Sequence, residues 1–340
     1  MSLKVTVTGA SGRIAYSLLP LLCNGDAFGR ETSLDLRLLD LPDCQKSLEG
    51  VKLEIYDSAY PLVTRVFTTT HADLAFDRTD VAILLGGFPR KPGMERKDLI
   101  SQNAAIMIDH GASIEKHASR DVKVLVIANP ANTNCLLASQ AAPSIPTRNF
   151  TCLTRLDHDR LRGMIAKKLN ELGPLVDYNT KDVRGVAVFG NHSTTQVAYL
   201  DSAEVCVEGS WVPVKTVLGR EWLENTLPEQ LQQRGAEIIS HLQASSAMSA
   251  ARAIVRHLSD WIGHGAGEDH VFSMGVRSDG NSYGVPDGLV CSFPCTRAFD
   301  APPGEYTIVS TCVLSQPLRA ALHRSVEELE MEKETAFKSL

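Results

Sequence analysis

The sequence lacks an apolar run long enough to cross a membrane, which takes about 20 residues in a helix. It also lacks a cationic leader ahead of an apolar segment, because "MSLKVTVTGAS" enters a strand pattern at once. A secretory signal peptide needs such a leader. We therefore expect no membrane span and no signal peptide, and we predict a cytoplasmic protein without a membrane partner.

A concentration of positive charge is also missing. The chain of 340 residues has 34 Lys and Arg against 40 Asp and Glu, a formal net charge of -6, and its cationic residues are scattered. Nucleic-acid-binding surfaces need clustered Lys and Arg. The composition thus argues against a nucleic-acid partner.

Cysteines at metal-binding spacing are absent as well. Buried thiols stay reduced in a cytosol-like compartment. Without a C-x-x-C pair we expect free core thiols and no metal site. The eight cysteines, most of them in apolar runs, are Cys23, Cys44, Cys135, Cys152, Cys206, Cys291, Cys295 and Cys312.

The first half of the chain alternates apolar strand patterns with amphipathic helix patterns. Continuous apolar strands separated by helices are typical of a parallel sheet that is covered on both faces. We therefore predict the fold class α/β, with a Rossmann-type doubly wound parallel sheet over residues 1–153. Its strands are expected at 3–9, 34–40, "TRVFTT", "VAILLGG" and 122–130.

Residues 154–340 show mixed strands and long helices. A helix begins near His158, a long helical tract runs from about Glu229 to Trp261, and an amphipathic helix ends the chain. Strands are expected at "HVFSMGV", "GLVCSFPCT" and "EYTIVS". This mixture favours a C-terminal α+β substrate domain. No repeat or low-complexity linker separates it from the first domain, so we expect the two to share an interface and a cleft.

The segment "VTVTGASGRIA" places Gly9, Gly12 and Ala15 between the first strand and the first helix. Small residues there let the turn close, let a pyrophosphate approach the backbone and let the helix pack on the sheet. The spacing G-x-x-G-x-x-A differs from G-x-G-x-x-G, and glycines in such a turn also occur for structural reasons alone.

Asp40 ends the second strand pattern, "LDLRLLD". A carboxylate at this point accepts hydrogen bonds from the ribose hydroxyls of an adenosine and repels a 2′-phosphate. The alternative is an Asp that caps the following turn. Together with the glycine turn, Asp40 predicts that the domain binds NAD.

A cationic segment, "FPRKPGMERKDL", follows the strand "VAILLGG" and carries Arg90, Lys91, Arg96 and Lys97. Charged loops are usually solvated. However, loops at the carboxyl ends of parallel strands lie where open α/β sheets bind ligands. This loop is therefore a candidate site for an anionic substrate.

The segments "TRLDHDR" and "FGNHSTTQ" supply a candidate proton-transfer pair, Asp157 and His192. Taken separately, Asp157 is a typical helix N-cap and His192 a typical polar loop residue. As a pair, the carboxylate fixes the tautomer of the imidazole and leaves its other nitrogen to exchange a proton with substrate. Arg160 lies on the same helix face as Asp157 and suits a bidentate clamp on a carboxylate.

Eight motifs occur in order over nearly the whole chain: "TGASGRIAYSLL", "FPRKPGMERKDL", "VIANPANTNC", "LTRLDHDR", "GNHSTTQ", "SSAMSAA", "SMGVRSDGNSYGVP" and "EMEKETAF". Together they resemble the cytosolic type of malate dehydrogenase, in the lactate and malate dehydrogenase superfamily. The resemblance implies reversible hydride transfer between NADH and oxaloacetate, which gives (S)-malate, and it implies a homodimer.

The resemblance also implies a role for each matching residue. His192 is the implied proton donor and acceptor and Asp157 its partner, while Arg160 holds the carboxylate beside the reacting carbon. Arg90 and Arg96 belong to a loop that closes on substrate, with Arg90 on the distal carboxylate and Arg96 polarising the carbonyl. Asn129 touches both substrate and cofactor. Implied cofactor contacts are Gly9, Gly12, Arg13, Ile14, Asp40, Asn103, His110, Ile127, Ala128 and Asn129.

Three positions depart from the family pattern. Arg13 stands where the family commonly has Gln, Ala128 stands where it has Gly, and His110 aligns with a Gln that contacts the cofactor. Every catalytic group is retained. The departures bear on cofactor affinity, and His110 is either a pH-sensitive contact or a plain histidine on a surface helix.

Two other functions stay open. The first is another 2-hydroxy acid dehydrogenase, acting on lactate or an aromatic hydroxy acid. Arg90 argues against it, because an arginine that faces a neutral tail lacks its partner. The second is an inactive paralogue with a structural or binding role. Such a protein has no reason to keep Asp157, Arg160, His192 and both loop arginines.

Overall fold

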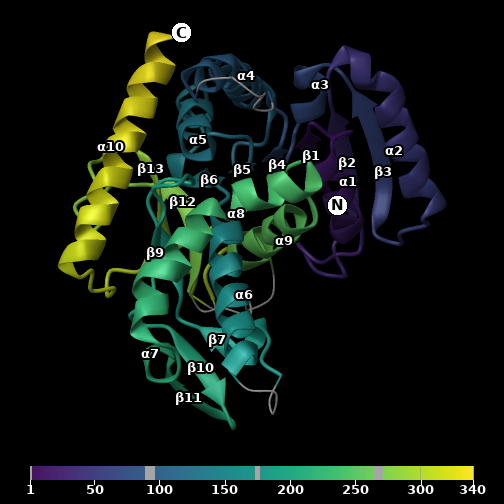
Figure 1. Ribbon diagram of the computed structural model, residues 1–340. Coiled ribbons are helices and arrows are strands. Elements are labelled where there is room, and N and C mark those ends of the chain that lie inside the picture. Colours follow the sequence, from purple (N-terminus) through teal and green to yellow (C-terminus); the bar gives the residue numbers. More distant parts are fainter. Residues whose placement is uncertain (1, 89–95, 173–176, 264–270, 299, 340) are drawn as a thin grey trace.

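The computed structural model describes residues 2–88, 96–172, 177–263, 271–298 and 300–339 (Figure 1). Arg90 and Lys91 of the predicted cationic loop lie outside these residues, and so does the side chain of Arg96.

A nine-stranded sheet forms the centre of the molecule, in the order β14-β13-β12-β6-β5-β4-β1-β2-β3 (Figure 1). The six strands from β6 to β3 pair in parallel. The chain runs outward from β1 to β3 and then returns to β4 on the other side of β1, which is the doubly wound arrangement. The predicted fold class is confirmed. The strands are β1 Leu3–Thr8, β2 Leu34–Leu39, β3 Val63–Thr69, β4 Val81–Leu84, β5 Lys123–Val126 and β6 Phe150–Cys152.

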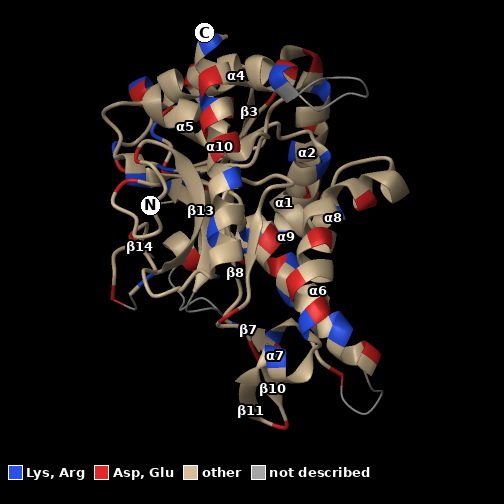
Figure 2. Ribbon diagram, turned by 60° about the vertical axis from the view of Figure 1, so that its left-hand side comes forward, with Lys and Arg blue, Asp and Glu red and all other residues tan. Residues whose placement is uncertain are grey.

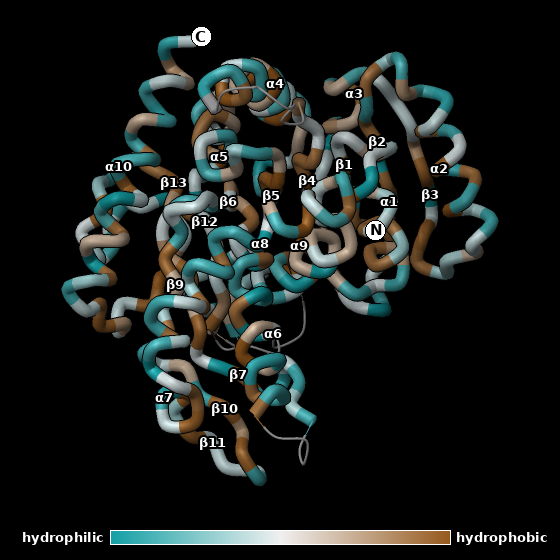
Figure 3. Tube along the Cα trace, in the orientation of Figure 1, coloured by the Kyte–Doolittle hydropathy of each residue, from teal (hydrophilic) through white to brown (hydrophobic). Residues whose placement is uncertain are grey.

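Both faces of the parallel sheet are buried, because alternate residues of its strands enter different cores. Ile83 and Leu125 belong to a core that includes residues of helices α1 and α9. Ala82, Leu84 and Val124 belong to a second core with helices α4 and α5. Figure 3 shows the hydrophobic residues gathered in the inner strands and alternating with hydrophilic ones along the outer helix α10. The first-domain helices are α1 Arg13–Cys23, α2 Gln45–Asp57, α3 Ala72–Phe76, α4 Arg96–His117 and α5 Ala131–Gln140.

The C-terminal part has its own core, in which α6 packs against β7, β8, β10 and α8. Its strands are β7 Val183–Arg184, β8 Ala187–Phe189, β9 Val197–Tyr199, β10 Glu204–Val207, β11 Ser210–Pro213, β12 Phe272–Arg277, β13 Val290–Thr296 and β14 Thr307–Ile308. Its helices are α6 Arg155–Leu172, α7 Val214–Val217, α8 Leu227–Leu242, α9 Met248–Ile262 and α10 Gln316–Lys338. Short 3-10 turns cover Pro42–Cys44, Thr147–Asn149 and Thr180–Asp182, and a π-helical turn covers Trp222–Thr226.

The prediction of one helical tract from Glu229 to Trp261 was wrong. The structure divides it into α8 and α9, because Gln243 adopts a left-handed conformation with φ of 52° at the end of α8. A left-handed residue ends an α-helix. The break has a consequence for the site, since it places Ser246 beside Arg160.

Figure 2 shows Lys and Arg positions interspersed with Asp and Glu positions along the ribbon, including helices α6 and α10. Within the described ranges, no helix is both long and apolar enough to span a membrane. The same residues hold no group of three or more His, Cys, Asp or Glu arranged to bind a metal ion. All eight cysteines are free, and burial raises the pKa of Cys23 and of Cys291 to about 12.

Candidate active site

The glycine turn lies at the carboxyl end of β1, beside the point where the strand order reverses. Gly9 has φ of 63°, and a Cβ there would lie 2.9 Å from the backbone of Gly86. Glycine is therefore needed at this position both for the backbone conformation and for the close approach of two loops. Gly12 is the exposed N-cap of α1 and has no side chain to cap the helix. The free N–H groups of the first turn are thus open to an anion.

Asp40 closes the other side of this turn. Its Oδ2 accepts hydrogen bonds from Ser11 N at 2.9 Å and Ser11 Oγ at 2.6 Å, and its Oδ1 accepts from Leu41 N at 2.9 Å. The carboxylate stays partly exposed. The structure brings Asp40 and the glycine turn together, as a ribose and pyrophosphate site requires.

Asn103 was predicted to contact the cofactor, but in the structure its side-chain amide bonds to the protein backbone. It is fully buried, and its Oδ1 accepts from Phe88 N at 2.7 Å. Its Nδ2 donates to the carbonyl oxygens of Phe88, at 3.3 Å, and Asn129, at 2.9 Å. Asn103 therefore ties the segment after β4 to the segment after β5, and leaves the exposed Asn129 at the sheet edge.

The other predicted cofactor residues differ in how far they are exposed. Arg13 is exposed, Ile14 is partly buried, and Ile127 and Ala128 are buried. His110 is not the plain surface histidine that its helix pattern favoured. Its ring packs edge-on against Phe76, with centroids 5.7 Å apart, and its Nδ1 is buried without a partner among the described residues. Burial lowers the pKa of His110 to about 4.

His192 and Asp157 are in direct contact. Nδ1 of His192 lies 2.5 Å from Oδ2 of Asp157, which is fully buried, whereas the His192 side chain is 18% exposed. Burial by itself raises the pKa of the Asp157 carboxyl. The charge and hydrogen bond of His192, reinforced by those of Arg160, outweigh burial and hold this pKa below its ordinary value. Asp157 is therefore an anion that orients the imidazole and leaves its Nε2 available.

Arg160 lies on the same helix face as Asp157. Its Nη1 donates to Oδ1 of Asp157 at 3.1 Å, and its Nη2 donates to Ser246 Oγ at 3.3 Å. A guanidinium has five N–H donors, so these two contacts orient the side chain and leave donors for a ligand. The structure thus brings His192, Asp157 and Arg160 into one cluster.

The remaining polar residues of "TRLDHDR" anchor α6, a function that sequence reasoning missed. Arg155 is fully buried and forms ion pairs with Asp159, at 3.1 Å, and with Asp260. Nδ1 of His158 lies 3.2 Å from Ser273 Oγ, and burial lowers its pKa well below the ordinary value. The Arg155–Asp159 spacing of four residues was a signal for such an ion pair within a helix.

Asn132 was also missed, although it belongs to the motif "VIANPANTNC". It is fully buried at the start of α5, and its Oδ1 accepts a hydrogen bond from the backbone N of His192 at 3.0 Å. Its Nδ2 donates to the carbonyl oxygens of Val290, at 3.1 Å, and Gly190, at 3.4 Å. A single amide therefore fixes the backbone on which His192 is carried.

The doubly wound sheet with its glycine turn, together with the histidine–aspartate pair, is typical of a dinucleotide-dependent oxidoreductase. Comparison with known families agrees. The model of the lactate/malate dehydrogenase NAD binding domain matches residues 3–151, and that of the lactate/malate dehydrogenase alpha/beta C-terminal domain matches residues 154–340. This chain belongs to the lactate/malate dehydrogenase family, and its N-terminal domain binds NAD.

Individual relatives are similar over their full length. Cytoplasmic malate dehydrogenase of Gallus gallus is 45% identical over 340 residues, which cover 99% of this chain and 98% of the relative. A malate dehydrogenase structure from Naegleria fowleri superposes with a TM-score of 0.90 at 38% identity, covering 100% of this chain and 99% of that one. A structure of Trichomonas vaginalis lactate dehydrogenase in complex with NADH and oxamate superposes with a TM-score of 0.91 at 34% identity, covering 99% of both chains.

Proposed function

We propose that this protein is an NAD-dependent malate dehydrogenase that interconverts oxaloacetate and (S)-malate in the cytoplasm. The observation that carries the proposal is the cluster of His192, Asp157 and Arg160, in a chain that is 45% identical over nearly its full length to cytoplasmic malate dehydrogenases. We assign residues 1–153 as the NAD-binding domain and residues 154–340 as the catalytic and substrate domain.

The residues of the cluster have distinct roles in this proposal. His192 donates a proton from Nε2 to the carbonyl oxygen of oxaloacetate, and it takes the proton back in the reverse direction. Asp157 stabilises the imidazolium through the contact at Nδ1. Arg160 holds the carboxylate beside the reacting carbon through its remaining donors. Arg90 and Arg96 bind the other end of the dianion, and Asn129 contacts substrate from the cofactor edge.

The cofactor-binding residues fit NAD. The turn of Gly9 and Gly12, with Arg13 and Ile14 after it, receives the pyrophosphate, and Asp40 accepts the ribose hydroxyls. His110, Ile127, Ala128 and Asn129 complete the cofactor contacts, and the buried Asn103 supports them by holding the Asn129 backbone in place. When bound, NADH supplies the hydride, whereas the protein supplies position, charge and the proton.

A lactate-type activity is the second candidate, because a lactate dehydrogenase structure superposes as well as a malate dehydrogenase structure does. Arg90 separates the two. Its guanidinium pairs with a distal carboxylate, which pyruvate lacks, so a dicarboxylate is the better partner for this loop.

We also propose a homodimer. Apolar and aromatic side chains are exposed on two neighbouring helices: Tyr16 of α1 is 54% exposed, and Leu53 and Tyr56 of α2 are 61% and 49% exposed. Such a group is typical of a surface that another chain covers. Light scattering should give about twice the mass of the chain, with a lower mass for Leu53→Glu. A monomeric wild type would contradict the proposal.

The activity is tested by following NADH oxidation with a panel of 2-oxo acids. We expect oxaloacetate to be the best substrate, and pyruvate and aromatic 2-oxo acids to be poor ones. A preference for pyruvate would favour the lactate-type alternative. NADH binding without turnover of any 2-oxo acid would identify an inactive paralogue.

A further inference from the structure

We propose that Glu328 and Glu332 of the C-terminal helix α10 are positioning residues that hold the segment 190–195, and with it His192, in its working place. The inference rests on the proposed function, in which His192 transfers the proton. The two glutamates lie one helical turn apart and face the same segment.

Glu328 binds the segment on both sides of His192. Its Oε2 accepts hydrogen bonds from Asn191 Nδ2 at 2.9 Å, from Thr195 Oγ1 at 2.6 Å and from Ser193 Oγ. Bonds that a carboxylate accepts are stronger than neutral ones. The residues directly before and directly after His192 therefore share one charged acceptor on α10.

Glu332 links this segment to the start of α5. It is only 3% exposed, and its Oε1 accepts from Asn191 Nδ2 at 3.0 Å, while its Oε2 accepts from Thr133 Oγ1 at 2.6 Å. Thr133 follows Asn132, which accepts the hydrogen bond from the backbone N of His192. The buried carboxylate of Glu332 therefore links the segment that carries His192 to the start of α5, where Asn132 binds the backbone N of His192.

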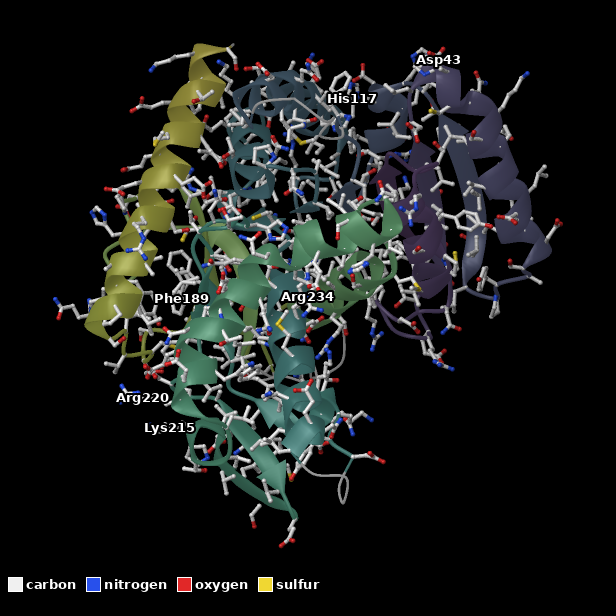
Figure 4. The ribbon with its side chains drawn as sticks, in the orientation of Figure 1. Asp43, His117, Phe189, Lys215, Arg220 and Arg234 are labelled. Carbon is white, nitrogen blue, oxygen red and sulfur yellow. The ribbon has the colours of Figure 1, made fainter. Side chains whose placement is uncertain are left out.

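The backbone of the segment is shaped for this contact. Gly190 has φ of 91°, and a Cβ there would lie 2.3 Å from Oγ of Ser325 on α10. That hydroxyl oxygen accepts from Asn191 N at 2.7 Å and lies 3.0 Å from Thr195 Oγ1. Phe189, just before Gly190 and labelled in Figure 4, is fully buried in the core that also contains Leu322 and Val326 of α10. Glycine at 190 therefore allows α10 to approach closely enough for its carboxylates to reach the segment.

The expected effect is on proton transfer rather than on cofactor binding. A displacement of about 1 Å at a reacting group can cost about a hundredfold in rate. The hydrogen bonds described above link Glu328 and Glu332 to the segment 190–195 and to Thr133, whereas Asp40 bonds to Ser11 beside the glycine turn. Replacing either glutamate with glutamine should therefore lower kcat and leave the KM for NADH unchanged.

The test compares Glu328→Gln and Glu332→Gln with Glu330→Gln, an exposed position on the same helix. We expect kcat to fall about ten- to hundredfold in the first two variants, and to stay within about twofold in the control. Values of kcat for the first two variants that match the control would overturn the proposal.

Combination with His192→Asn distinguishes positioning from general damage. If the glutamates act through His192, then Glu328→Gln should cost no further activity once His192→Asn is present, because effects on one shared function are not additive. If the kcat losses of Glu328→Gln and His192→Asn multiply in the double variant, Glu328 does not act through His192. Thr195→Val removes a donor to Glu328 without altering α10, and it should also lower kcat. This variant tests the proposal even if the glutamate variants fail to fold.

A spectroscopic measurement keeps this inference separate from the proposed function. In protein labelled at histidine, the His192 ring resonance is the one that disappears in His192→Asn. It should shift or broaden in Glu328→Gln and Glu332→Gln, and should be unchanged in Glu330→Gln. Failure of the wild type to oxidise NADH with any 2-oxo acid would end the proposed function, whereas an unchanged resonance would end the positioning role.

Discussion

Gly275 of β12 lies directly opposite Cys152 of β6, and a Cβ on Gly275 would lie 2.0 Å from Cys152 Sγ. This antiparallel pair joins the hairpin of β12 and β13 to the parallel sheet of the N-terminal domain. The absence of a side chain at residue 275 is therefore what lets the two domains share one sheet.

We expect Gly275→Ala to destabilise the fold by about 1 to 3 kcal/mol, the usual cost of overpacking a core. Urea unfolding measures it. Gly163→Ala is the control, because a Cβ there meets nothing within 4 Å. Adding Cys152→Ala should recover part of the loss, since it removes the clashing sulfur. Strictly additive costs would contradict the proposed clash.

His192→Asn should lower turnover by about 10² to 10⁴-fold, the contribution that a general acid-base group typically makes. NADH binding, followed by fluorescence, should be unchanged, because the imidazole acts on substrate. His323→Asn serves as the control, since that side chain is 75% exposed. Near wild-type turnover in His192→Asn would assign the proton to another residue.

Asp40→Ser should narrow the preference for NADH over NADPH. The substitution removes a carboxylate that accepts ribose hydrogen bonds and repels a 2′-phosphate. A lost hydrogen bond to a charged group costs about 1.5 to 3 kcal/mol, so efficiency with NADH should fall about ten- to hundredfold. Steady-state kinetics with both cofactors measure it. Asp43→Ser, at an exposed position (Figure 4), should leave the ratio unchanged.

Arg90→Gln should change the choice of substrate. Removing one partner of a buried charge pair typically costs about 2 to 5 kcal/mol, so oxaloacetate efficiency should fall by at least tens-fold. Pyruvate has no distal carboxylate and should lose little. Lys91→Gln is the control, and should leave the ratio of the two efficiencies nearly constant. An equal fall for both acids would mean that Arg90 serves loop closure in general.

Stability should decline as the pH falls below 6.5, in part because of His257. Burial, aided by the charge of Arg155, lowers the pKa of His257 from 6.5 to about 3. Between these values the unfolded chain binds a proton there and the folded chain does not, so acid favours unfolding. Two pKa units correspond to about 2.7 kcal/mol, which is the loss expected from this group near pH 4.5.

The measurement for His257 is urea unfolding of the wild type and His257→Gln between neutral and acid pH. The variant should lose less stability on acidification. His158, whose pKa burial also lowers, should continue to contribute in both proteins. An identical pH dependence of the free energy of unfolding would show that His257 is not protonated on unfolding.

The sequence by itself determined the parallel domain and its ligand edge. A strand that is apolar on both faces must be covered on both faces, and the left-handed backbone of the turn after β1 favours glycine at position 9. The spacing of Asp157 and Arg160 follows from helix geometry, so their shared face was predictable. These features depend on contacts between residues close in sequence or on a regular repeat.

Only the tertiary structure decided which distant residues meet. No periodicity predicts that Glu332 accepts from Thr133, 199 residues earlier, or that Asn132 binds the backbone N of His192. The break that places Ser246 beside Arg160 was likewise hidden within a helical pattern. Such contacts depend on how the helices and strands pack, and local sequence patterns carry no information about partners that only packing brings within hydrogen-bonding distance.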